Sequence, residues 1–63
     1  MATVSEQIRE ARKRVNLTQL QLANAAGVSR SYLAGVEQGK YNPSFKTLKK
    51  IASVCGVDLN FFQ

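Results

Sequence analysis

A glycine between two short stretches of helical periodicity is the feature that most limits how this chain can fold. Apolar residues recur at helical spacing on both sides of Gly27, at Leu22, Ala23 and Ala26 before it and at Val28, Leu33 and Val36 after it. Glycine takes the positive φ that ends a helix without steric cost. Ser29 is a residue type that begins helices well. Residues 19–39 therefore predict two short helices joined by a tight turn.

Two such helices have two interpretations. They form a DNA-reading helix-turn-helix, whose second helix lies in the major groove, or a plain helical hairpin inside a small bundle. Ala23 is small enough to let the second helix cross close to the first, which suits both structures. The spacing alone leaves both interpretations open.

The net charge of the chain indicates which class of partner it favours. The 63 residues include 9 Lys and Arg against 4 Asp and Glu, which gives a formal net charge of +5. A chain of this length is one domain, and we assign residues 1–63 to it. The excess of positive charge favours a polyanionic partner such as nucleic acid, although a well-solvated surface is the simpler explanation.

The residue types exclude several classes of function. The chain has no His and one Cys, which removes the usual metal sites, disulfide frameworks and His-based catalysis. The acids are scattered and no glycine-rich phosphate loop is present, so we expect neither an enzyme nor a cofactor. Cys55 lies on an apolar helical face and is interpreted as a core thiol. Without a signal peptide or an apolar run of about 18 residues, we expect a cytoplasmic protein that does not contact membranes.

The periodicity predicts an all-α fold of five helices. They run from Thr3 or Ser5 to Val15, from Gln19 to Ala26, from Ser29 to Gln38, from Ser44 to Val54, and through a last short turn after Asp58. Asn16 is expected to adopt a left-handed conformation after the first helix, and Thr18 to cap the second. Phe45 is expected to point into the core.

Several short sequences in the same order resemble the family of phage Cro and repressor proteins. These are Leu17-Thr18-Gln19, Leu22-Ala23, Gly27-Val28-Ser29, Glu37, Gly39, Asn42-Pro43-Ser44, Leu48, Ile51-Ala52 and Gly56-Val57. The resemblance implies a compact five-helix, lambda-repressor-like DNA-binding domain with the helix-turn-helix at its second and third helices. It also implies a sequence-specific transcriptional regulator, repressor-like, that binds a double-stranded DNA operator as a homodimer.

The subtype and the extent of the protein stay open. Residues 30–37 are similar to the recognition helix of restriction–modification controller proteins, and many phage and plasmid repressors share the same pattern. An antitoxin or another protein-interaction module that uses this fold is the alternative function. The chain is either a whole protein or the DNA-binding domain of a longer repressor.

Candidate base-reading residues lie near the start of the third helix, where side chains reach base edges. Arg30 donates from a planar fork that suits guanine, although it could equally hold a phosphate. Ser31 could read either base type weakly, and Ala34 could offer its methyl group to thymine. Further residues are assigned to the DNA phosphates: Gln19, Ser29, Tyr32, Gln38, Lys40, Tyr41, Asn42 and Lys46.

The family resemblance also assigns an ion pair and an expected role for Gln19. Glu37 is an acid in a basic region, and the resemblance implies that it pairs with Arg12 of the first helix. The alternative is a weak surface pair. The resemblance further implies that Gln19 contacts phosphate and buttresses Arg30.

Three residues depart from the family pattern. Leu20 and Ala25 stand where charged or polar residues are usual. Leu20 is then a surface hydrophobe or part of a protein contact. Gly35 is expected on the outward face of the recognition helix, where it reads no base. Its lack of a side chain would permit close approach to DNA, or would have no functional meaning.

The last apolar residues suggest a dimer interface. A one-turn helix is expected to bury only one of Phe61 and Phe62, which leaves the other ring at the surface. We assign the interface to Val57, Leu59, Phe61 and Phe62, since a two-fold contact is a common way to cover such a patch.

Overall fold

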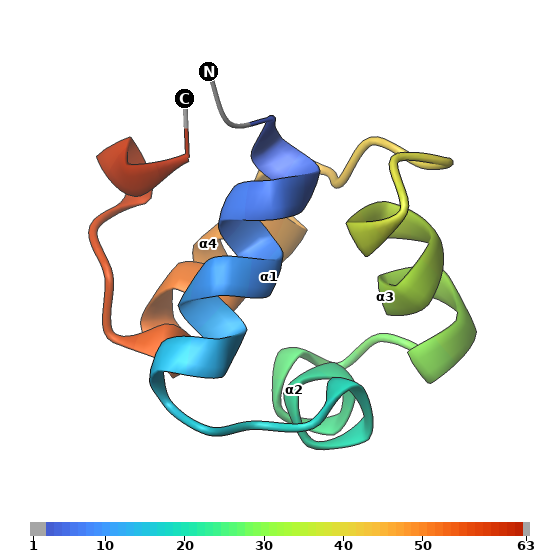
Figure 1. Cartoon of the computed structure of the whole chain (residues 1–63), viewed down its shortest axis with the longest axis horizontal. Coiled ribbons are helices and arrows are strands. Elements are labelled where there is room, and N and C mark those ends of the chain that lie inside the picture. The colour runs from blue at the N-terminus through green and yellow to red at the C-terminus, as the bar shows by residue number, and fades with distance from the viewer. Residues whose placement is uncertain (1–2, 63) are drawn as a thin grey trace.

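The computed structural model describes residues 3–62 and contains four α-helices followed by one turn of 3₁₀-helix. The elements are α1 (Val4–Arg14), α2 (Gln19–Ala26), α3 (Arg30–Glu37), α4 (Phe45–Cys55) and η1 (Leu59–Phe61). In Figure 1, α1 crosses in front of α4, α2 lies below it and α3 to one side. The all-α fold is confirmed, but the expected fifth helix is only the 3₁₀ turn η1.

The helix ends follow from residues that satisfy free backbone groups. Thr18 Oγ1 accepts from Gln21 N at 3.1 Å, while Gln21 Oε1 accepts from Thr18 N at 2.9 Å, a reciprocal capping box. Ser29 and Ser44 begin α3 and α4 as N-caps, so those helices start one residue later than expected. Asn16 has a φ of +57°, which confirms its left-handed conformation after α1.

Thr3 forms a second capping box with Glu6 at the start of α1. The hydrogen bond from Thr3 N to Glu6 Oε1, 2.9 Å long, lowers the pKa of the Glu6 carboxyl. A lowered pKa in the folded state means that this contribution to stability is present near neutral pH and is lost on acidification.

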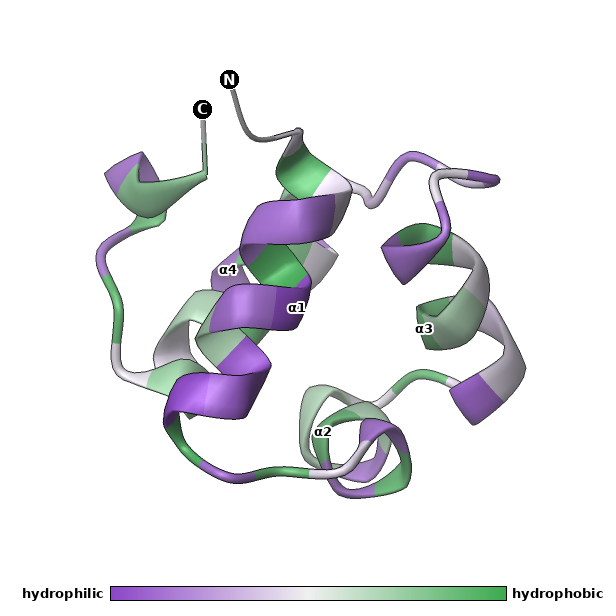
Figure 2. Ribbon diagram, in the orientation of Figure 1, coloured by the Kyte–Doolittle hydropathy of each residue, from purple (hydrophilic) through white to green (hydrophobic). Residues whose placement is uncertain are grey.

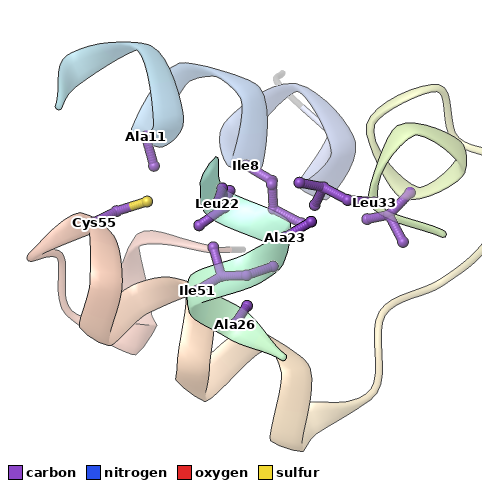
Figure 3. Packing of buried hydrophobic residues seen from close by; sticks show 9 residues of the cluster. Ile8, Ala11, Leu22, Ala23, Ala26, Leu33, Ile51 and Cys55 are labelled. Atoms are coloured by element: carbon purple, nitrogen blue, oxygen red, sulfur yellow. The ribbon is translucent and has the colours of Figure 1, made fainter. Parts of the chain in front are cut away.

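The core is formed where the four α-helices face one another. Figure 3 shows Ile8 of α1, Leu22 of α2, Leu33 of α3 and Ile51 of α4 pointing toward a common centre. All four side chains have no exposed surface. Ala23 is also fully buried and lets α2 lie against its neighbours. In Figure 2 the hydrophilic residues of α1 alternate with hydrophobic ones, as expected of a helix with one buried face.

Two expectations about aromatic residues are wrong. Phe45 does not enter the core, since 65% of its surface is exposed. It is the first residue of α4, and the side chains of that helix that pack against the core begin with Leu48. Phe61 and Phe62 are both half-buried, and neither lies free at the surface. Their rings meet edge to face at 5.5 Å, and both pack against the core.

Cys55 is buried, as expected, with 4% of its surface exposed. Burial raises the pKa of its thiol above the ordinary value. We expect Cys55 in the native protein to react with a thiol reagent roughly tenfold or more slowly than in denaturant, because local opening must precede reaction. A colorimetric thiol assay at pH 8 measures both rates.

The matched control for this thiol assay moves the cysteine by two residues. Ser53 is exposed on the same helix, so the double variant Ser53→Cys, Cys55→Ala should react as fast natively as in denaturant. Equal rates for native wild-type protein and this variant would show that the Cys55 side chain is open to solvent.

Candidate nucleic-acid interface

The two helices at the centre of the candidate interface are joined by a turn that Gly27 makes possible. Gly27 has a φ of +73°, and the N–H of Val28 donates to the carbonyl of Ala23 at 3.0 Å. A residue with a β-carbon rarely adopts this backbone conformation. The turn directs α3 across α2, so that the start of α3 lies at the surface, at the right of Figure 1.

Glu37 at the end of α3 is buried and bound by Arg12 of α1. Only 2% of its surface is exposed. Arg12 Nε donates to Glu37 Oε2 at 2.8 Å and Arg12 Nη2 donates to Oε1 at 3.0 Å, a two-pronged ion pair. The structure therefore brings together the pair that the resemblance implied, and it lies in the protein interior rather than at the surface.

Three more hydrogen bonds surround this pair, one of them to the same carboxylate and two to backbone carbonyls. Gln19 Nε2 donates to Glu37 Oε1 at 3.2 Å, and Arg12 Nη1 donates to the carbonyl of Leu17 at 2.9 Å. Arg9 Nη2 donates to the backbone carbonyl of Glu37 at 3.0 Å. The sequence reasoning missed the part played by Arg9. Its spacing of three residues from Arg12 on one helix face was the available signal.

Gln19 thus has a partner that the sequence did not suggest. Its amide lies against Glu37 and is half-buried. Gln19 is also the first residue of α2, where backbone N–H groups have no partner within the helix. The cap by Thr18 satisfies the N–H of Gln21, one residue beyond Leu20. The start of α2 therefore retains donors that suit an anion.

A surface groove connects the start of α2 to the start of α3. It is lined by Arg12, Thr18, Gln19, Leu20 and Arg30. Arg30 is exposed and Leu20 has 52% of its surface exposed. A phosphate group would meet positive charge and helix N–H groups here. The sequence reasoning placed Leu20 at the surface but did not connect it to this groove.

The remaining candidate contacts are distributed over one continuous part of the chain, from the start of α3 to the start of α4. Most of them are exposed, namely Ser29, Arg30, Ser31, Gln38, Lys40, Tyr41, Asn42 and Lys46. Tyr32 and Ala34 are half-buried. Within α3 the only acid, Glu37, is buried, so Arg30 supplies the only charge on its exposed surface.

Gly35 was expected on the outward face of α3, but the structure does not place it there. It is buried, and a β-carbon built on it would lie 2.3 Å from Cε2 of Tyr41. The Tyr41 ring occupies the space that a side chain at this position would need. The interpretation of Gly35 as a place of close approach to DNA is therefore wrong, because Tyr41 covers it.

The four residues assigned to a dimer interface lie at the end of the described chain. Val57, Leu59, Phe61 and Phe62 are all half-buried, and η1 contacts α4. The guanidinium of Arg14 lies over the Phe61 ring at 5.1 Å from its centre. The contact with Arg14 ties η1 to the end of α1.

Among residues 3–62, no helix is long and apolar enough to cross a membrane. Over the same residues, no group of three or more His, Cys, Asp or Glu side chains lies close enough to hold a metal ion.

Sequence and structure comparisons agree on one family. Residues 8–62 match the profile of the family described as Helix-turn-helix. The chain is 47% identical over 58 residues to the immunity repressor protein of Bacillus phage phi105. This match covers 92% of the chain but only 40% of that relative, so the chain spans less than half the length of the phage protein.

Two solved structures share the fold at higher than 30% identity. The restriction–modification controller protein C.AhdI from Aeromonas hydrophila superimposes with a TM-score of 0.87 at 33% identity, over 92% of this chain and 88% of that one. The biofilm master regulator SinR of Bacillus subtilis, solved in complex with DNA, gives 0.86 at 32% identity, over 92% and 94%. These matches confirm the lambda-repressor-like fold.

The family is one of transcriptional regulators and not of enzymes, as the sequence predicted. The match covers the turn at Gly27, the buried pair of Arg12 and Glu37, the part of α1 from Ile8 onward, and all of α2, α3 and α4. The chain belongs to the Cro/C1-type helix-turn-helix family.

Proposed function

We propose that this chain binds a two-fold DNA operator as a homodimer and represses transcription, with α3 in the major groove. The observation that carries the proposal is the distribution of charge on α3. Its acid is buried against Arg12, while Arg30 at its start is exposed. The exposed face is therefore positive and polar, which suits the edges and phosphates of DNA.

The candidate residues divide by role. Arg30, Ser31 and Ala34 face base edges, with Arg30 making the main specific contact. Gln19, Ser29, Tyr32, Gln38, Lys40, Tyr41, Asn42 and Lys46 hold the phosphates on either side. The groove between Arg12 and Arg30 receives one phosphate at the start of α2. SinR, which is similar in fold and was solved in complex with DNA, supports DNA binding by this chain.

The dimer forms through the C-terminal segment. Val57, Leu59, Phe61 and Phe62 each keep part of their apolar surface exposed, and a two-fold contact would cover it. Two copies of α3 would then reach half-sites about one helical turn of DNA apart. A DNA-binding regulator acts in the compartment that holds the DNA, so the proposal retains the cytoplasmic location that the sequence predicts.

Similarity to the phage immunity repressor, at 47% identity, favours a repressor. Similarity to C.AhdI supports the alternative that the chain is a restriction–modification controller protein. The antitoxin or protein-interaction alternative would call for an acidic or apolar exposed face on α3, and that face carries Arg30 and Ser31 instead.

Selection from a random pool of duplex DNA tests this function. We expect enrichment of a sequence with two-fold symmetry, whose half-site centres lie roughly 34–36 Å apart. Sedimentation of the complex on that duplex should give two protein chains per site. A pool that remains random after several rounds, at low salt, would contradict DNA recognition. A single chain per site would contradict the dimer alone.

A further inference from the structure

The Tyr41 ring lies over α3 at the one buried position where α3 has no side chain. A β-carbon on Gly35 would approach Cε2 and Cδ2 of Tyr41 to 2.3 and 2.4 Å. Real β-carbons essentially never come that close to another atom. The glycine is thus a notch in α3 that the ring fills, and any larger residue would displace the ring.

The same ring also stacks on a residue at the start of α3. The Tyr32 and Tyr41 rings have their centres 5.9 Å apart and lie within 12° of parallel. Tyr32 packs against the hydrophobic core, whereas 53% of the surface of Tyr41 is exposed. Tyr41 therefore joins the recognition helix to the solvent-facing segment that follows it.

Backbone hydrogen bonds fix the beginning of that segment but not its middle. Lys40 N donates to the carbonyl of Gly35 at 2.8 Å, and Gly39 N donates to that of Val36 at 3.1 Å. From Tyr41 to Pro43 the chain has no helical or strand structure. The ring of Tyr41 contacts α3 at Gly35 and Tyr32 and so connects this stretch to the helix.

We infer that Tyr41 is a positioning residue of the DNA interface, which orders the 39–43 loop and Tyr32 by seating its ring in the Gly35 notch. This inference rests on the proposed function and changes one of its assignments. Tyr41 acts through its ring, and a hydrogen bond from its hydroxyl to phosphate is not required. Its neighbours Lys40 and Asn42, which flank it in the exposed loop, are then presented to the phosphates in a fixed arrangement.

The inference predicts opposite effects on folding and on DNA binding. Gly35→Ala gains helix propensity, which should raise the Tm by roughly 4–8 °C in a domain of this size, less the effect of the packing lost when the ring moves. In Gly35→Ala, DNA binding must order the displaced Tyr41 ring and the 39–43 loop. This should lower the affinity for DNA about three- to tenfold. A purely structural role would move stability and affinity in the same direction.

The test compares four proteins on the selected duplex, namely wild type, Gly35→Ala, Tyr41→Ala and the double variant. Fluorescence anisotropy gives the affinities and thermal unfolding gives the Tm values. The two single variants should each bind about three- to tenfold more weakly, and the double variant no more weakly than Tyr41→Ala alone. Gly35→Ala should raise the Tm further in the Tyr41→Ala background than in the wild type.

Tyr41→Phe is the matched control, because it keeps the ring and removes the hydroxyl. It should bind within about twofold of wild type, since the seat in the notch is intact. A loss as large as that of Tyr41→Ala would overturn the inference and make the hydroxyl a direct phosphate donor. Full additivity of Gly35→Ala and Tyr41→Ala would also overturn it.

An NMR measurement on the free protein separates this inference from the proposed function. Gly35 lies beside the Cδ2–Cε2 edge of the Tyr41 ring, so its α-proton shifts should be displaced by the ring current and should return to ordinary values in Tyr41→Ala. An unshifted Gly35 in wild type would overturn the seated ring. Failure of the wild type to bind DNA would instead contradict the proposed function.

Discussion

Replacing Glu37 with alanine should destabilise this domain by about 3–5 kcal/mol, which is most of the stability expected of so small a fold. Only 2% of the surface of Glu37 is exposed, and its carboxylate accepts hydrogen bonds from Nε and Nη2 of Arg12. Removing it leaves the Arg12 guanidinium, which is 13% exposed, without its counter-charge. Gln19 would lose a hydrogen-bond acceptor as well. Denaturation in urea, followed by circular dichroism, measures the loss.

The control for Glu37→Ala is a second acid on the surface. Glu10 and Arg14 form an ion pair at 4.0 Å in which both side chains are more than half exposed. Glu10→Ala should therefore change the free energy of unfolding by less than about 0.5 kcal/mol. Similar losses for the two variants would mean that the Glu37 pair is as weakly coupled as a surface pair.

Arg30→Ala should lower affinity for the selected operator by roughly 1–3 kcal/mol, about five- to 150-fold, and relax the preference at one base pair in each half-site. Arg30 is the only charged residue on the exposed surface of α3 and stands at its first position. Its side chain is exposed, so the substitution should leave the Tm nearly unchanged. Affinities for a set of single-base operator variants, at two salt concentrations, measure the effect.

Lys40→Ala is the matched control for Arg30→Ala, because it removes one positive charge from another exposed residue of the candidate interface. It should weaken binding to all sequences alike and reduce the slope of log affinity against log salt by about one. If Arg30→Ala behaves in the same way, Arg30 holds a phosphate and the bases are read by other residues.

Much of the fold could be predicted because the turn and cap residues place the helix ends where the spacing of the apolar residues also places them. Gly27 at the turn and the caps at Thr18 and Ser29 act on their own neighbours, so their effect can be read from short spacing. The resemblance supplied the pairing of Arg12 with Glu37, which periodicity alone does not give. It did not reveal that the pair is buried, that Gln19 donates to the same carboxylate, or that Arg9 donates to the backbone carbonyl of Glu37.

The errors fall where distant residues decide the outcome. Gly35 was expected outside because helical spacing cannot show that Tyr41 folds back over it. Phe45 has the spacing of a core residue, but it is the first residue of α4 and stays exposed, while Leu48 is the first side chain of that helix to pack against the core. One of Phe61 and Phe62 was expected in the core and the other at the surface. Instead the two rings pack edge to face, and both are half-buried.

The most direct test of the account is to map the DNA-contacting surface by NMR, with the selected duplex added to ¹⁵N-labelled protein. We expect the largest amide shifts at Gln19 and in 29–32 and 38–42, with small shifts along the exposed side of α1. Two copies of the protein should saturate one duplex. The largest shifts along α1, with residues 29–32 unchanged, would contradict the placement of α3 in the major groove.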